Sequence, residues 1–168
     1  KKGYGSEPRP RILLAAHMDA IGLMVTGVTD GFLSFTEIGG IDPRLLPGLR
    51  VTVHAKRDLP GVIVMPRDAL LPERKSETRV EMKYLFIDLG LSAAETAELV
   101  QIGDLVSFTQ EPMELPNDII TGHSLDNRVS VAAVTVCLEE LHNVQHTWDV
   151  WAVATAQEEE TLGGGFTA

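Results

Sequence analysis

Three consecutive glutamates, Glu158, Glu159 and Glu160, directly follow an apolar stretch near the end of the sequence. Residues 148–155 read as a largely apolar strand of the kind found inside parallel sheets. Carboxylates crowded at the end of a buried strand raise one another's pKa, and burial adds to that cost. We therefore expect a cation here. Adjacent glutamates that point in different directions could serve as a metal ligand and as a separate general base.

A second segment with the same layout lies near the start of the sequence. Residues 11–16 are a short apolar run that predicts a buried strand, and His17 and Asp19 follow at its carboxyl end. Open α/β sheets bind their ligands at this end of their strands. The imidazole would suit zinc or cobalt, and Asp19 could orient it from behind. Alone, the pair is weak evidence, because a histidine at a strand end is more commonly an ordinary hydrogen-bonded residue.

A third acidic residue, Asp126, precedes a long apolar stretch over residues 128–141, which predicts a largely buried helix. Taken singly, Asp126 or the neighbouring Asn127 is best interpreted as the N-cap of that helix. An aspartate here could also bridge two cations with its two oxygens. Together the three segments supply one nitrogen and several oxygen ligands, which suits a hydrolytic site of the zinc type.

The elements between these segments are short and β-like. Turn signals separate apolar runs that predict strands at residues 23–28, 32–35, 50–54, 61–64 and 104–109. Such a density of short strands is typical of a small barrel or sandwich. Ser92 and Glu95 form a capping box that predicts a short helix over about residues 93–100, and residues 71–80 predict an exposed charged loop. The predicted architecture is an α/β domain, residues 1–19 and 113–168, interrupted by a β-rich domain over residues 20–112.

The composition of the chain indicates which kinds of partner and which cellular location to expect. The chain has 168 residues, of which 44% are hydrophobic, enough for a core, and its net charge of −10 argues against nucleic-acid binding. No apolar run reaches the roughly 18 residues that suggest a membrane-spanning helix, and no signal-peptide pattern opens the sequence. The single cysteine, Cys137, excludes an internal disulfide and fits a reducing compartment, so we expect a cytoplasmic protein.

Three blocks of the sequence resemble the metal-site blocks of the glutamyl, deblocking and tetrahedral (TET) aminopeptidases, some of whose relatives are labelled endoglucanases. The blocks are residues 15–25, 122–129 and 156–159, and further matching segments lie at 39–42, 61–63, 85–90 and 103–106. The resemblance implies part of a mixed-sheet aminopeptidase catalytic domain, interrupted by a barrel-like dimerisation domain over residues 20–112. It also implies a homo-oligomer that assembles through that domain, commonly into large tetrahedral particles.

The resemblance further implies a site with two divalent metal ions, most readily zinc or cobalt. In that site His17 and Glu159 would bind one ion, and Asp126 would bridge both ions and be followed by a cis peptide. Glu158 would be the general base that activates a bridging water, and Asp19 would support His17 or the metal from behind. The implied reaction is the removal of N-terminal residues from peptides.

The sequence departs from the family pattern in several places. Asn127 stands where the family usually has a second aspartate, and Glu160 stands where it has a small or apolar residue. The family takes an Asp and a His for the second metal from sequence after the segment that matches this chain. We therefore expect a C-terminal remainder, without which the second site lacks ligands and catalysis is incomplete.

Two other classes of function stay open. The chain could be a non-catalytic assembly or binding relative, or an inert fragment. Size-exclusion chromatography of residues 20–112 would test whether that domain self-associates. The chain could also be a glycosidase of the endoglucanase type, because paired carboxylates cleave glycosidic bonds as well. His17 and the metal-like layout argue against a glycosidase, and metal-independent cleavage of cellulose would discriminate the two.

Overall fold

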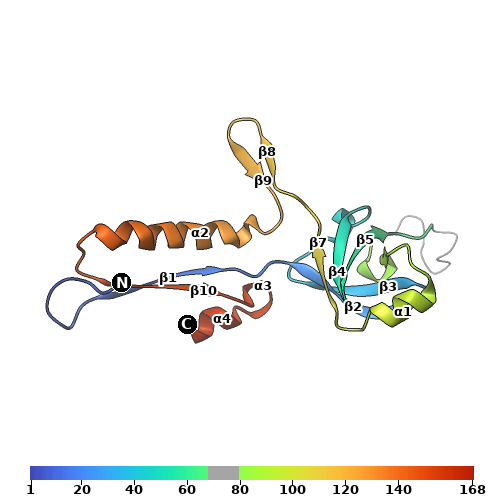
Figure 1. Ribbon diagram of the computed structural model, residues 1–168, viewed down its shortest axis with the longest axis horizontal. Coiled ribbons are helices and arrows are strands. Elements are labelled where there is room, and N and C mark those ends of the chain that lie inside the picture. Colours follow the sequence, from blue (N-terminus) through green and yellow to red (C-terminus); the bar gives the residue numbers. More distant parts are fainter. Residues whose placement is uncertain (68–79) are drawn as a thin grey trace. The chain divides into compact units, whose positions relative to one another are not determined.

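The computed structural model describes residues 1–67 and 80–168 (Figure 1). Two compact units emerge: Lys1–Ala20 together with Ser124–Ala168, which we call the α/β unit, and Ile21–His123, which we call the barrel unit. The charged loop predicted over residues 71–80 lies outside the described residues except for Val80. In the described part of the chain, no helix is long and apolar enough to cross a membrane.

Six antiparallel strands close the barrel, in the order β2-β3-β6-β5-β4-β7. Their bounds are Gly22–Thr29 for β2, Phe32–Ile38 for β3, Arg50–His54 for β4, Asp58–Val64 for β5, Phe86–Asp88 for β6 and Leu105–Phe108 for β7. Buried and exposed residues alternate along β4 and β5, as the two-residue period of a strand requires. The predicted small barrel or sandwich is thus a closed barrel.

Apolar side chains from the strands and from the adjoining segments fill the barrel. The core cluster comprises Leu23, Val25, Leu33, Phe35, Leu46, Val51, Val53, Leu59, Ile63, Leu85, Ile87, Val100 and Val106. Closure pairs the strand edges with one another and leaves the alternating inner face to side chains. The core of the barrel unit is therefore built from its own sequence.

Short helices and a hairpin complete the barrel unit. Two 3-10 turns, η1 (Pro43–Leu45) and η3 (Met82–Tyr84), lie between strands, and α1 spans Ala93–Leu99. The capping box at the start of α1 is confirmed: Ser92 Oγ accepts from the Glu95 N–H, and the Glu95 carboxylate accepts from the Ser92 N–H at 2.9 Å. The antiparallel hairpin of β8 (Met113–Leu115) and β9 (Ile119–Thr121) was not predicted.

The α/β unit is built on two parallel strands. Strand β1 (Arg11–His17) pairs with β10 (Asp149–Thr155) in continuous register, from Arg11 opposite Asp149 to His17 opposite Thr155. Helix α2 (Leu125–Glu140) contacts β1, and the short η4 (Leu141–Asn143) follows it. Helices α3 (Glu158–Thr161) and α4 (Gly163–Thr167) come after β10.

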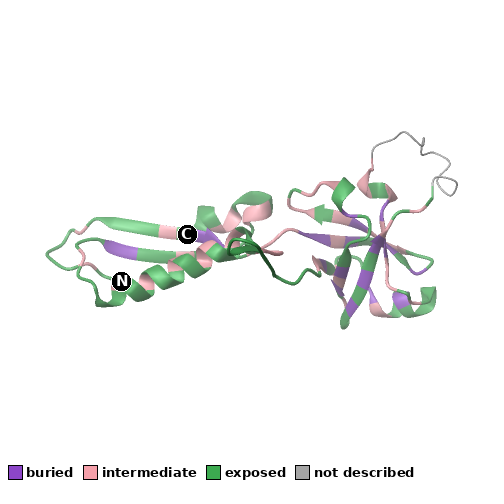
Figure 2. Ribbon diagram, turned by 90° about the horizontal axis from the view of Figure 1, so that it is seen from above, coloured by how far each residue is buried: buried purple, intermediate pink, exposed green. Residues whose placement is uncertain are grey.

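The deep burial predicted for the elements of this unit is wrong for most of their length (Figure 2). Helix α2 has no buried residue, and Trp151 on β10 is 60% exposed. A strand is buried on both faces only where another layer packs against each face. Helix α2 can cover only one face of the sheet formed by β1 and β10. Within the described α/β unit, burial is concentrated at the strand ends, including Ala16, His17 and Thr155.

Candidate metal centre

The in-register pairing of β1 and β10 brings the ends of the two strands to one level. His17 is the last residue of β1 and lies opposite Thr155, the last residue of β10. The Met18 N–H continues this pairing by donating to the Thr155 carbonyl at 2.9 Å. Asp19 follows β1, and the glutamates of α3 follow β10. These acidic residues therefore lie at the same end of the two-stranded sheet.

His17 is the centre of the cluster, and its side chain is 8% exposed. Its Nε2 lies 3.1 Å from Asp126 Oδ1 and 3.5 Å from Glu158 Oε2. On the other side of the ring, Nδ1 lies 3.3 Å from the backbone carbonyl of Asp19 and 3.5 Å from its carboxylate. One imidazole thus touches acidic residues from three separate segments of the chain.

The Asp19 side chain links the segment after β1 to the segment after β10. Its Oδ2 accepts a hydrogen bond from the Glu159 N–H at 3.3 Å. Burial raises the pKa of Asp19, but the backbone N–H groups of Glu159 and Glu158 hold that pKa below its ordinary value. Its Oδ1 is buried and has no hydrogen-bond partner among the described residues. The ionised Asp19 carboxylate therefore has an oxygen that could accept a further bond.

Asp126 lies in the first turn of α2, where the backbone is irregular. Asp126 and Asn127 both have non-helical angles, and the peptide between them is cis, as the resemblance implies. Ser124 precedes α2 and makes no side-chain capping bond, whereas regular helical backbone begins only after Asp126 and Asn127, so these two residues lie at a helix start as the N-cap interpretation expects. The carboxylate of Asp126 is turned toward His17, although 87% of its side chain is exposed.

Sequence reasoning missed a contact that fixes this turn. Arg128 donates from Nε to the Met18 carbonyl at 3.1 Å, which ties the start of α2 to the residue after His17. The only signal in the sequence is an arginine two positions after Asp126, and such a residue reads equally well as a solvated charge.

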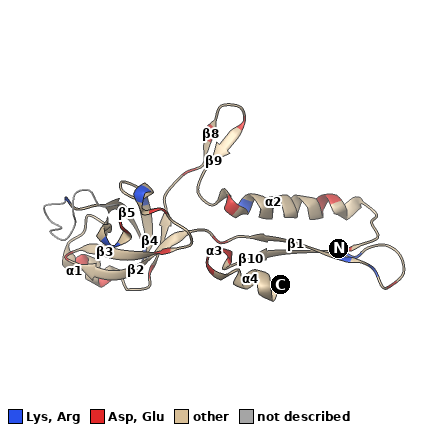
Figure 3. Ribbon diagram, turned by 180° about the vertical axis from the view of Figure 1, so that it is seen from behind, with Lys and Arg blue, Asp and Glu red and all other residues tan. Residues whose placement is uncertain are grey.

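Three of these side chains form a group that could hold a metal ion. His17, Glu158 and Glu159 each offer one ligand atom, and the three atoms lie within 4.8 Å of one another. Asp126 is outside this group but approaches the same imidazole nitrogen. Glu160 is exposed and is also outside the group. Figure 3 shows acidic residues at the start of both α2 and α3.

The electrostatics of the cluster are dominated by negative charge. Burial lowers the pKa of His17, but Glu158 foremost, with Asp19 and Asp126, raises that pKa above its ordinary value. Burial also raises the pKa of Glu159; His17 opposes this, while Glu158, Asp126 and Asp19 add to it. A single imidazole cannot balance these carboxylates. The nitrogen and oxygen donors on the Nε2 side of His17 fit a divalent cation.

Comparisons with known proteins agree with this arrangement. The family model of the M42 glutamyl aminopeptidases matches residues 1–168. The crystal structure of a TET aminopeptidase from a marine sediment archaeon of the Thaumarchaeota superposes with a TM-score of 0.86 at 30% identity, over 96% of this chain and 48% of that one. The TET1 peptidase of Pyrococcus horikoshii superposes with a TM-score of 0.79 at 36% identity, over 97% of this chain and 49% of that one.

A curated relative gives the same result. The lysyl aminopeptidase of Pyrococcus furiosus is 29% identical over 164 residues, which are 95% of this chain and 47% of the relative. The chain thus spans about half the length of the relatives that it matches. Because the family model covers every residue from 1 to 168, this chain belongs to the M42 glutamyl aminopeptidase family.

Proposed function

We propose that the full-length protein is a metal-dependent aminopeptidase that removes N-terminal residues from peptides. The observation that carries this proposal is the convergence of ligand atoms from His17, Glu158 and Glu159 within 4.8 Å, in a chain of the M42 family. Because the chain spans about half the length of its relatives, the activity is proposed for the whole protein.

Some residues of this chain would bind the metal ions directly, and others would orient those ligands. His17 and Glu159 would hold one divalent ion, zinc or cobalt, and Asp126 would bridge it to a second ion. The remaining ligands of the second ion would come from sequence that this chain does not include. When bound, the ions supply Lewis acidity that activates water and polarises the scissile carbonyl.

Both ring nitrogens of His17 face oxygens: Nδ1 faces the Asp19 carbonyl at 3.3 Å and its carboxylate at 3.5 Å, and Nε2 faces Asp126 and Glu158. With a metal ion bound at Nε2, the proton of the neutral imidazole would be on Nδ1, where Asp19 would accept it. Asp19 thus supports the reaction from behind, by orienting the imidazole and by accepting the N–H of Glu159.

Glu158 is proposed as the general base. Its carboxylate would take a proton from the attacking water and later deliver it to the amine that leaves. Glu158 begins the short α3, directly after Gln157, which has a left-handed backbone with φ of 62°. Because of this left-handed residue, the chain changes direction between β10 and the acidic residues of α3.

The finer proposals on assembly and location have their own support. We propose that the protein forms a homo-oligomer, because the TET1 peptidase of Pyrococcus horikoshii can assemble into a tetrahedron or a large octahedral shell. The family resemblance is the reason to propose residues 20–112 as the segment that mediates this assembly. The single cysteine, Cys137, is exposed and free, which supports a cytoplasmic location.

Chelation of the full-length protein tests the proposal. We expect a chelator to abolish the cleavage of aminoacyl chromogenic substrates, and zinc or cobalt to restore it. Circular dichroism before and after chelation serves as the control that the fold survives. Turnover that persists after the metal has been removed would refute a metal-dependent aminopeptidase.

A further inference from the structure

The backbone of Met18 is tied to two other elements of the α/β unit. Its N–H donates to the carbonyl of Thr155, the last residue of β10, at 2.9 Å. Its carbonyl accepts from Nε of Arg128, near the start of α2, at 3.1 Å. Met18 is the single residue between His17 and Asp19. The bond from Arg128 therefore links the start of α2 directly to the residue that follows the imidazole.

The first turn of α2 carries Asp126 and lacks regular helical backbone. Asp126 has φ of −82° and ψ of 109°, and Asn127 has φ of −125° and ψ of 33°. The side chain of Asp126 is 87% exposed, so packing does not hold its carboxylate in place. Its Oδ1 nevertheless lies 3.1 Å from Nε2 of His17. The position of this carboxylate must therefore come from the backbone of the turn and from the contacts that anchor that turn.

Arg128 supplies such an anchor two residues after Asp126. Its own N–H donates to the Ser124 carbonyl at 3.3 Å, which closes the turn around Asp126 and Asn127. Its guanidinium reaches the Met18 carbonyl, so a charged donor meets a neutral acceptor. Hydrogen bonds from a charged donor are stronger than those between neutral groups. Arg128 thus holds the irregular turn from within and fastens it to the end of β1.

We propose that Arg128 is a positioning residue of the metal centre, whose hydrogen bond to Met18 keeps the Asp126 carboxylate in place for metal binding. This inference rests on the proposed function, in which Asp126 bridges two ions. Of the residues in this chain, His17 and Glu159 would hold the first ion without Asp126, whereas the second ion would have Asp126 alone. Loss of the hydrogen bond should therefore weaken the binding of the second ion more than that of the first.

The charge of Arg128 and its hydrogen bond have opposite effects on cation binding. A guanidinium near the centre repels a metal ion, so removal of its charge alone should strengthen binding. Removal of the hydrogen bond should weaken binding, because the Asp126 carboxylate is then no longer held. Two uncharged substitutions separate these effects. Glutamine carries its amide nitrogen on Cδ, as arginine carries Nε, whereas methionine has a side chain of similar length and no donor.

Metal binding is measured on the full-length protein. The metal-free protein is titrated with cobalt, and equilibrium dialysis with elemental analysis gives the affinity for each successive ion. In Arg128→Met we expect the second ion to bind about 10- to 100-fold more weakly than in the wild type, with little change for the first. Arg128→Gln should bind the second ion at least as tightly as the wild type does. Both substitutions remove the same charge, so a difference between them reports on the hydrogen bond.

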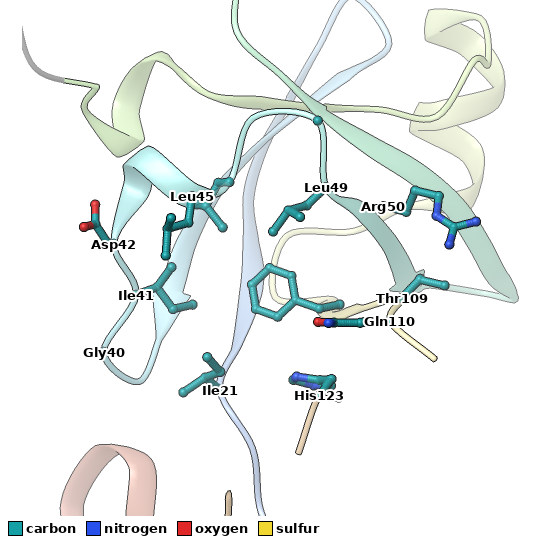
Figure 4. Close-up of a pocket in the computed structure, with 13 residues that line it drawn as sticks. Ile21, Gly40, Ile41, Asp42, Leu45, Leu49, Arg50, Thr109, Gln110 and His123 are labelled. Carbon is teal, nitrogen blue, oxygen red and sulfur yellow. The ribbon is translucent and has the colours of Figure 1, made fainter. Parts of the chain in front are cut away.

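A matched control removes the same charge elsewhere. Arg50 is an exposed arginine of the barrel unit, and Figure 4 shows its guanidinium directed away from the pocket that it borders. Arg50→Met should leave the affinity for both ions unchanged. Arg128 is also exposed, so its variants should fold, and circular dichroism verifies this. Arg128→Ala, which also lacks the donor, takes the place of Arg128→Met if the latter does not fold.

The outcomes separate this inference from the proposed function. Equal affinity for the second ion in Arg128→Met and the wild type would overturn the positioning role, and so would equal losses in Arg128→Met and Arg128→Gln. Either result in a protein that binds two ions and loses its peptidase activity on chelation would leave the proposed function intact. A wild type that binds no cobalt, or one ion only, would refute the two-ion site and this inference with it.

Discussion

The barrel unit and the α/β unit treat their apolar residues in opposite ways. Every residue of the hydrophobic core cluster belongs to the barrel unit. In the α/β unit Leu13, Val129 and Trp151 are between 49% and 60% exposed, and the buried polar residues His17 and Thr155 lie at the strand ends. Within residues 1–168, which span about half the length of the relatives, the barrel unit has a hydrophobic core, whereas the α/β unit leaves apolar side chains exposed and has its charged cluster at the strand ends.

This contrast separates stability from chemistry. The barrel closes on itself, so its integrity depends on how its own side chains pack. The candidate metal centre instead depends on where β1 and β10 end and on the first turn of α2. Changes in the two units should therefore affect different measurements.

The largest expected effect concerns the candidate base. Glu158→Gln should lower turnover by about 100- to 10,000-fold, because an amide cannot take the proton from water. Bound metal, measured by elemental analysis, should be retained, and the stability of the barrel should be unchanged. Loss of the metal would instead assign Glu158 as a ligand, because its carboxylate belongs to the group of possible ligands. Glu160→Gln is the matched control, since Glu160 lies outside the group of possible ligands. Unchanged turnover in Glu158→Gln would refute its role as base.

A substitution in the barrel core should instead lower the stability of the chain. Leu33 is fully buried, and Leu33→Ala should lower the free energy of unfolding by about 2–5 kcal/mol through lost burial and a cavity. Chemical denaturation of the chain of residues 1–168 measures this loss. Trp151→Ala in the same chain should cost far less, because that side chain is 60% exposed. Equal losses would break the contrast between the units.

The cap of α1 tests the barrel unit at a smaller scale. Ser92→Ala removes the hydroxyl that accepts the Glu95 N–H, and should cost about 0.5–2 kcal/mol in the free energy of unfolding. A thermal melt should show a lower midpoint, with a smaller shift for Ser92→Gly, since glycine is tolerated at an N-cap. A midpoint in Ser92→Ala that matches the wild type would show that the cap contributes nothing.

The smallest effect is a dependence on pH in the α/β unit. The pKa of Asp149 is lowered by the hydrogen bond from Arg9 Nε at 2.8 Å and by the Gly3 N–H at 2.7 Å. A depressed pKa in the folded state favours folding above the unfolded value of about 3.9, and this contribution is lost as pH falls through the folded value.

Asp149→Asn should therefore flatten the dependence of unfolding on pH below about pH 4. The measurement is urea denaturation at a series of acidic pH values, and Asp118→Asn, at an exposed hairpin turn, is the control. The same acid sensitivity in Asp149→Asn as in the wild type would contradict the assignment.

The barrel was largely predictable because its signals are local. Strands over residues 23–28, 32–35, 50–54 and 61–64 are confirmed, since alternation and glycine turns mark them in the sequence. The capping box of α1 is a four-residue pattern and was predicted correctly. Strands β6, β8 and β9 were missed because three residues are too short to show a period.

The candidate site was predictable as a set of segments but not as a geometry. His17 and Glu158 follow apolar runs and Asp126 precedes one, so the sequence indicates where polar side chains adjoin apolar segments, and the structure brings all three together. Which carboxylate oxygen lies nearest the imidazole depends on the irregular turn at Asp126, which no local pattern specifies. The predicted burial of α2 is not found within residues 1–168. The apolar content of a helix shows that its faces can be covered, but it does not show which element covers them.

The order of the units along the chain has a consequence for synthesis. The barrel unit is one continuous stretch, Ile21–His123, whereas the α/β unit is split around it. Strand β1 cannot find its partner until β10 has been made, and Arg11 pairs with Asp149 across the whole barrel sequence. Since chains emerge from the ribosome N-terminus first, the barrel can close while β1 is still an unpaired apolar strand. During that interval the newly made chain presents β1 as an unpaired apolar strand, the kind of transiently exposed edge that chaperones protect from aggregation.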